Sequence, residues 1–111
     1  MVRFEVLLFR DGGRSPVDKF IEKCSATQQS KILRQLAYLY EFGLTSANPC
    51  LRKLSGTNLW ELRILGRDNI RLVCVQRTNT IVVLDVFFKK GKKTPKNDLE
   101  TALYREKRLD I

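Results

Sequence analysis

The sequence contains no histidine and no Cys-x-x-Cys motif, and both absences restrict the chemistry open to the chain. Histidine is the residue best suited to acid–base catalysis near neutral pH and a common ligand of zinc. The three cysteines, Cys24, Cys50 and Cys74, are widely spaced and odd in number, which is typical of reduced, buried thiols. We therefore expect no metal and no cofactor, and proton transfer would have to use carboxylates or lysines.

Long hydrophobic runs are also missing. No apolar run approaches the roughly 18 residues that a transmembrane helix needs. The N-terminal stretch MVRFEVLLFRDGG has too short an apolar part, and too much charge after it, for a secretory signal. The sequence thus predicts a cytoplasmic protein with no membrane partner. Its 111 residues, 43% hydrophobic and 30% charged, predict a single globular domain over residues 1–111.

Acidic residues are scarce relative to basic ones: 12 Asp and Glu stand against 21 Lys and Arg, giving a net charge of +9. Residues 1–50 carry 7 basic and 5 acidic side chains, whereas residues 51–111 carry 14 and 7. An excess of cations in one half of a small domain favours a polyanionic partner, with nucleic acid ahead of a membrane surface. On charge alone, this is only slightly favoured over a basic surface that serves solubility.

The first half of the chain predicts one strand and two helices. VRFEVLLF alternates between apolar and polar residues as a half-buried strand does, and Asp-Gly-Gly then allows a tight turn. Ser15 followed by Pro16 is a helix start, because the serine hydroxyl caps free N–H groups and proline fits the first turn. A second helix should begin near Ser25, with Gln28 completing a capping box, and should end at Gly43.

The second half predicts three strands and a last helix. The strands LWELRIL, IRLVCVQ and TIVVLDVFF are joined by the short connectors GRDN and RTN, which favours an antiparallel meander. The stretch LTSANPCLRKLSGTN before them is interpreted as irregular, and Thr94 and Pro95 are expected to cap and open the last helix. The order β-α-α-β-β-β-α predicts an α+β fold: a mainly antiparallel sheet with two helices packed on one face and a C-terminal helix.

Strand alternation predicts where the cations fall. The helix-covered face must be apolar, so Glu61 and Arg63 of LWELRIL and Arg71 of IRLVCVQ should project from the opposite face. Arg52 and Lys53 precede these strands, and FFKKGKKTPK follows the last one. Taken singly, an arginine on a sheet face more often pairs with a cross-strand acid than serves a function. Four segments converging on one face instead favour a phosphate-binding surface.

Such a surface would suit RNA cleavage as well as RNA binding. Arginine and lysine can hold a phosphodiester and stabilise the negative charge that grows on it in a transition state. The ribose 2′-OH is an internal nucleophile, so the reaction needs no metal. The proton acceptor would be Glu61 or a lysine whose pKa is lowered by neighbouring cations. No spacing in this set is by itself diagnostic of cleavage.

Four blocks, SPVDKF, LWELRI, IRLVCV and FFKKGKKTPKNDLETALYRE, resemble in order and spacing the RelE/ParE superfamily of toxins. The closest resemblance is to the phage-derived HigB-like branch, and it covers nearly the whole chain. It implies a toxin of a type II toxin–antitoxin system that cuts mRNA in the ribosomal A site by 2′-OH attack. It also implies a cognate antitoxin as partner, typically a helix-turn-helix protein encoded next door.

Carried over by position, the resemblance implies that Arg63 and Arg71 face the scissile phosphate and that Tyr104 is a weaker candidate. The resulting catalytic set is Arg63, Arg71, Lys53, Lys89, Lys90 and Glu61. The expected RNA-binding set is Arg52, Lys92, Lys93 and Lys96. Relatives often carry aromatic residues where this chain has Ile70 and Cys74, and some carry a catalytic histidine, so the general acid and base stay open.

Two alternatives remain at this point. A ParE-like toxin would share the fold but poison DNA gyrase, and the lysine cluster argues against it. A non-catalytic nucleic-acid-binding module would use the same basic face without cutting RNA. A neighbouring reading frame for a small helix-turn-helix protein would favour a toxin over this second alternative.

Overall fold

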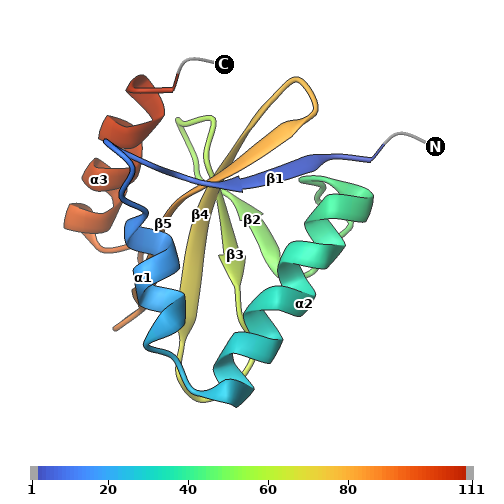
Figure 1. The fold of residues 1–111 in the computed structure, drawn as a ribbon, viewed down its shortest axis with the longest axis vertical. Coiled ribbons are helices and arrows are strands. Elements are labelled where there is room, and N and C mark those ends of the chain that lie inside the picture. Colours follow the sequence, from blue (N-terminus) through green and yellow to red (C-terminus); the bar gives the residue numbers. More distant parts are fainter. Residues whose placement is uncertain (1–2, 110–111) are drawn as a thin grey trace.

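Three helices and five strands make up residues 3–109, the part of the chain that the computed structural model describes (Figure 1). In chain order they are β1 (Glu5–Leu8), α1 (Pro16–Glu22), α2 (Ala26–Phe42), β2 (Leu51–Lys53), β3 (Trp60–Arg63), β4 (Ile70–Arg77), β5 (Thr80–Phe88) and α3 (Lys96–Lys107). None of these helices is long and apolar enough to cross a membrane.

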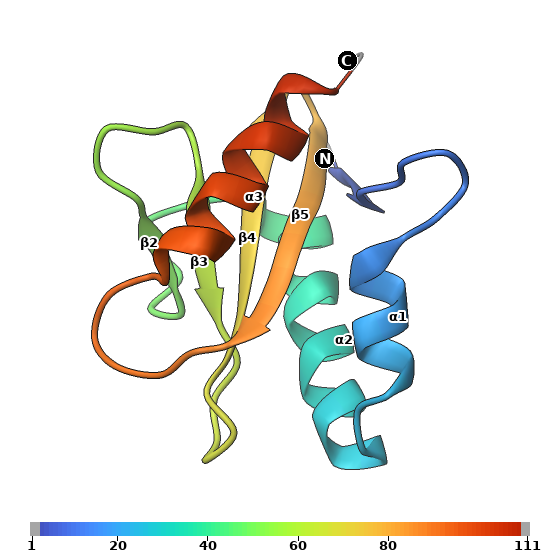
Figure 2. The ribbon, with the colours of Figure 1, turned by 90° about the vertical axis from the view of Figure 1, so that its left-hand side faces the viewer.

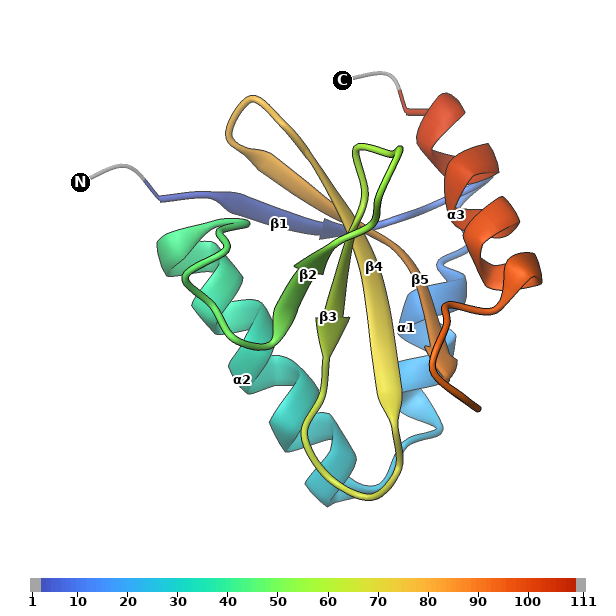
Figure 3. The same cartoon turned by 180° about the vertical axis from the view of Figure 1, so that it is seen from behind.

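The five strands form one sheet in the order β1-β5-β4-β3-β2. β1 runs parallel to β5, and the other neighbours are antiparallel, so the predicted α+β class and mainly antiparallel sheet are confirmed. The predicted element order is wrong in one place, because Leu51–Lys53 pairs with β3 as the edge strand β2 (Figure 3). The sequence gives no sign of it, since three residues are too few to show an alternating pattern.

Two hydrophobic layers hold the sheet between its helices. One lies between the sheet and α1 with α2, and includes Ile32, Leu39, Leu62 and Leu72. The other lies under α3 on the opposite face, and includes Val73, Val75, Leu84 and Ala102. Figure 2 shows α3 on one side of the sheet and α1 and α2 on the other. The predicted apolar positions of β3 and β4 therefore face the α1/α2 layer, as alternation requires.

The helix starts follow the sequence at two of three places. Ser15 caps α1 by accepting from the Asp18 N–H at 3.1 Å, and Ser25 and Gln28 form the predicted capping box of α2. The predicted Thr94 cap of α3 is wrong, because Pro95 holds the N-cap position and no side chain caps this helix. The Thr94 hydroxyl instead donates to Glu61.

Candidate functional site

A buried carboxylate, Glu61, lies at the centre of the site on β3. Only 4% of this residue is exposed. In the strand register Glu61 lies opposite Arg52 of β2, and two residues further along β3, Arg63 lies opposite Arg71 of β4. Strand alternation sends all four side chains to the face away from α1 and α2. Glu61 and Arg63 thus share a face with Arg71, as the sequence predicts.

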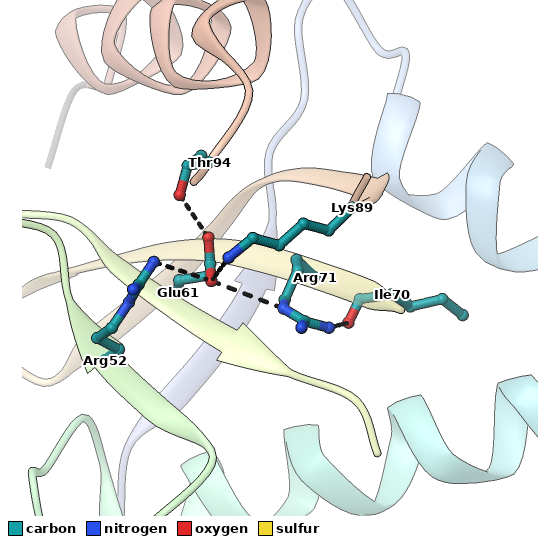
Figure 4. Close-up of polar contacts among 6 residues, drawn as sticks. All are labelled: Arg52, Glu61, Ile70, Arg71, Lys89 and Thr94. Atoms are coloured by element: carbon teal, nitrogen blue, oxygen red, sulfur yellow. Dashed lines mark hydrogen bonds and ion pairs between the residues drawn. The ribbon is translucent and has the colours of Figure 1, made fainter. Parts of the chain in front are cut away.

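Three cations converge on one oxygen of this carboxylate (Figure 4). Glu61 Oε1 lies 3.2 Å from Lys89 Nζ, 3.4 Å from Arg52 Nη2 and 3.6 Å from Arg71 Nε. Lys89 is itself only 9% exposed, which is rare for lysine and requires a charged partner. Glu61 supplies that partner, so the two buried charges depend on each other.

The second oxygen of Glu61 binds the start of the α3 segment. Thr94 Oγ1 donates to Glu61 Oε2 at 2.5 Å. At the other end of the lysine-rich turn, the Lys89 N–H donates to the Asn69 carbonyl at 2.8 Å. The turn formed by residues 90–93 is therefore fastened on both sides beside the cation cluster.

Arg71 is the more enclosed of the two cross-strand arginines. Its side chain is 12% exposed, and its Nη1 donates to the Ile70 carbonyl at 3.2 Å. Burial lowers the pKa of the Arg71 guanidinium, Glu61 raises it, and the nearby Arg63 and Arg52 lower it further. The group still stays charged, because an arginine starts far above neutral pH. Arg63 is exposed beside it.

These side chains line a hollow of about 300 Å³. Its polar lining consists of Arg52, Glu61, Arg63, Arg71 and Lys89, four cations against one carboxylate. A larger hollow of about 700 Å³ lies between the β1–α1 connection and α3, but there Asp11 and Glu100 offset the cations. The smaller hollow therefore has the charge and the arginine geometry to hold a phosphate group.

Comparison with known proteins assigns the chain to a family. Residues 19–107 match the family described as Phage derived protein Gp49-like (DUF891). The protein belongs to this Gp49-like family. No curated protein sequence gives a significant match.

The fold of this Gp49-like protein is that of a solved toxin. It superposes on E. coli toxin RelE, a mutant with two arginines replaced by alanine in the free state, with a TM-score of 0.67 and 20% sequence identity. The match covers 94% of this chain and 98% of that chain. The RelE-like fold expected from the sequence is thereby confirmed.

In the Gp49-like protein, Lys53 lies away from the cations around Glu61. It lies opposite Trp60 in the β2–β3 register, and its Nζ is 5.8 Å from the centre of the Trp60 ring. Because Arg52 and Lys53 are adjacent in a strand, their side chains leave opposite faces of the sheet. Arg52 therefore joins the hollow around Glu61, whereas Lys53 lies toward the α1/α2 side.

The remaining predicted lysines lie around the cluster rather than in it. Lys90, Lys92 and Lys93 are exposed in the turn after β5. Lys96 is exposed on the first turn of α3, 4.0 Å from Glu100. Tyr104, the weaker candidate, is 59% exposed near Arg108 on α3 and has no contact with Glu61.

The sequence reasoning missed a second buried acid. Asp85 on β5 is 8% exposed, and Arg105 of α3 donates to its Oδ1 at 3.3 Å and to the Leu84 carbonyl at 2.7 Å. Burial, followed by a hydrogen bond and repulsion from Asp98, raises the pKa of Asp85 to about 7 against the opposing effect of Arg105. The buried Asp85 Oδ2 atom has no hydrogen-bond partner among the described residues.

Proposed function

We propose that the protein is the toxin of a type II toxin–antitoxin system and acts as a ribosome-dependent mRNA interferase. The observation that carries the proposal is the convergence of Arg52, Arg63, Arg71 and Lys89 on one hollow of about 300 Å³. Membership of the Gp49-like family and the RelE fold support it. The substrate is mRNA in the ribosomal A site, and the partner is a cognate antitoxin with a helix-turn-helix.

In this proposal, Arg63 and Arg71 bind the scissile phosphate from adjacent strands. The 2′-oxygen forms a bond to phosphorus as the bond from phosphorus to the 5′-oxygen breaks, leaving a 2′,3′-cyclic phosphate and a 5′-OH. The 2′-OH loses one proton and the leaving 5′-oxygen gains one. The two guanidinium groups stabilise the extra negative charge on the phosphorus centre, and Arg71 is held in place for this by Glu61 and the Ile70 carbonyl.

The exposed lysines hold the RNA on either side of the scissile phosphate. Lys90 lies next to the buried Lys89, and Lys92, Lys93 and Lys96 extend the positive surface along the turn into α3. Such contacts are electrostatic and independent of sequence, so they set the affinity and its salt dependence. Lys53, at the edge strand, would contact RNA outside the hollow.

Mapping mRNA ends after induction tests the proposal. Primer extension on translated messages should show new 5′ ends within A-site codons in cells that express the wild-type chain. Co-expression of the product of the neighbouring reading frame should remove both the cuts and the growth arrest. Growth arrest without new mRNA ends would contradict the proposal, and an SOS response in those cells would favour a gyrase poison. RNA binding without toxicity would favour a non-catalytic module.

A further inference from the structure

Both carboxylate oxygens of Glu61 are engaged by protein groups, and the residue is buried. A general base needs a carboxylate oxygen within hydrogen-bond reach of the hydroxyl it deprotonates. Here Oε1 already faces Lys89, Arg52 and Arg71, and Oε2 accepts from Thr94. These partners also bury the carboxylate, which is 4% exposed. The geometry therefore points away from proton transfer by Glu61.

The same contacts join segments that are distant in the chain. Glu61 connects β2 through Arg52, β4 through Arg71, the end of β5 through Lys89, and the segment leading into α3 through Thr94. Without the carboxylate, the cations of these segments would repel one another at short range. Their close approach around one hollow thus depends on this one anion.

The lysine-rich turn gains most from the connection. Its four residues, 90–93, have few internal constraints: Gly91 has a φ of +100°, and a Cβ placed on it would meet nothing within 4 Å. Lys89 fastens one end of the turn to Glu61 Oε1, and Thr94 fastens the other to Glu61 Oε2. Both ends of the turn are thus held by a single side chain.

We propose that Glu61 is a positioning residue, which clamps the lysine-rich turn and orients Arg71, rather than the proton acceptor of the site. Its effect on RNA cleavage rests on the proposed function, whereas the clamp on the turn does not. Thr94 is the second half of the clamp, and its hydroxyl has no role in proton transfer.

Substitution of Thr94 separates the clamp from acid–base chemistry, because it leaves the Glu61 carboxylate in place. In T94V, native-state trypsin cleavage after Lys90, Lys92 or Lys93 should be about tenfold faster, as expected when a hydrogen bond to a charged group is lost. T94S keeps the hydroxyl and should restore the wild-type rate. T101V makes the same change within α3, away from Glu61, and serves as the matched control.

Ribosome-dependent mRNA cleavage gives the second measurement. T94V should cleave more slowly than T94S and T101V, with the pH dependence of the wild type. E61Q, checked for a cooperative unfolding transition, should lose activity and open the turn together. The proposal is wrong if T94V leaves the trypsin rate at the wild-type value, or if E61Q keeps its activity and loses only the acidic limb of the pH profile. A wild-type protein that cuts no mRNA overturns the proposed function alone, and the trypsin comparison then decides the clamp.

Discussion

Glu61 and Asp85 lie in one row across the sheet, both opposite Val73 of β4, yet their surroundings differ. Glu61 is surrounded by three cations and a hydroxyl donor, at the open side of the sheet. Asp85 lies beneath α3 with one cation, Arg105, and a second carboxyl, Asp98. The two buried acids are thus alike in position and opposite in charge balance.

This difference shows how charge balance assigns a role to a buried carboxylate. Where cations outnumber the acid, the acid neutralises part of their repulsion and leaves a net positive hollow that can accept a phosphate. Where burial and a second carboxyl outweigh a single cation, the pKa of the acid is raised and the ion pair contributes to helix docking instead. The first arrangement concerns function, and the second concerns stability.

Removing each acid in turn is the strongest test of this contrast. E61A should lower the free energy of unfolding by about 3–5 kcal/mol, because Lys89 becomes a buried charge without a counter-ion. D85A should cost less, since Arg105 still donates to the Leu84 carbonyl. Urea denaturation monitored by tryptophan fluorescence measures both. The double variant E61M/K89M should regain much of the loss, and equal effects of E61A and D85A would contradict the contrast.

The catalytic side of the comparison is tested by R71A. If Arg71 stabilises the transition state from a fixed position, its loss should reduce mRNA cleavage by about 100- to 1,000-fold. R34A removes the same charge from an exposed position on α2 and should leave cleavage unchanged. Cleavage rates on programmed ribosomes provide the measurement. Equal rates for R71A and R34A would remove Arg71 from the proposed mechanism.

The alternation of side chains along a strand explains which part of the site could be predicted from the sequence. The alternation in LWELR places Glu61 and Arg63 on one face, and the observed register agrees. The face on which Lys53 lies could not be predicted, because alternation between faces applies only within a strand and this stretch is interpreted from sequence as irregular. The three-residue β2 is recognised only by its pairing with β3. Pairing between distant segments depends on tertiary structure, which local patterns do not contain.

The contacts of Thr94 and Asp85 were beyond local patterns for a similar reason. Thr94 has the composition of a helix cap, but the acceptor on Glu61 is 33 residues away and a charged acceptor forms the stronger bond. Asp85 stands in an otherwise apolar strand, and its cation lies 20 residues later on α3. The fold class and the face of the site could be predicted from strand and helix patterns, whereas these partners meet only through the tertiary fold.

The pH dependence of stability tests the Asp85 side of the contrast. The pKa of Asp85 is raised to about 7 in the folded protein, so between pH 4 and 7 the folded state holds a proton that the unfolded state has lost. The free energy of unfolding should therefore fall as pH rises through this window, by about 2 kcal/mol once solvent screening is allowed for. D85N should flatten this fall, while D68N, an exposed control, should keep it. Urea denaturation at pH 5 and pH 8 gives the free energy of unfolding at each pH. If the assignment is wrong, the change in this free energy between the two pH values will be the same in D85N as in the wild type.

The smallest expected effect concerns the exposed lysines of the turn beside Glu61. Replacing Lys92 or Lys93 with alanine should weaken binding to RNA of any sequence and reduce the slope of log affinity against log salt by about one. Lys107, near the far end of α3, is the matched control, and K107A should keep the wild-type slope. Fluorescence anisotropy with a short single-stranded RNA at several salt concentrations gives the slopes. If all three variants have the same slope, the lysines act only through the overall charge of the protein. Lys92 and Lys93, near the hollow, would then make no specific contact with the RNA backbone.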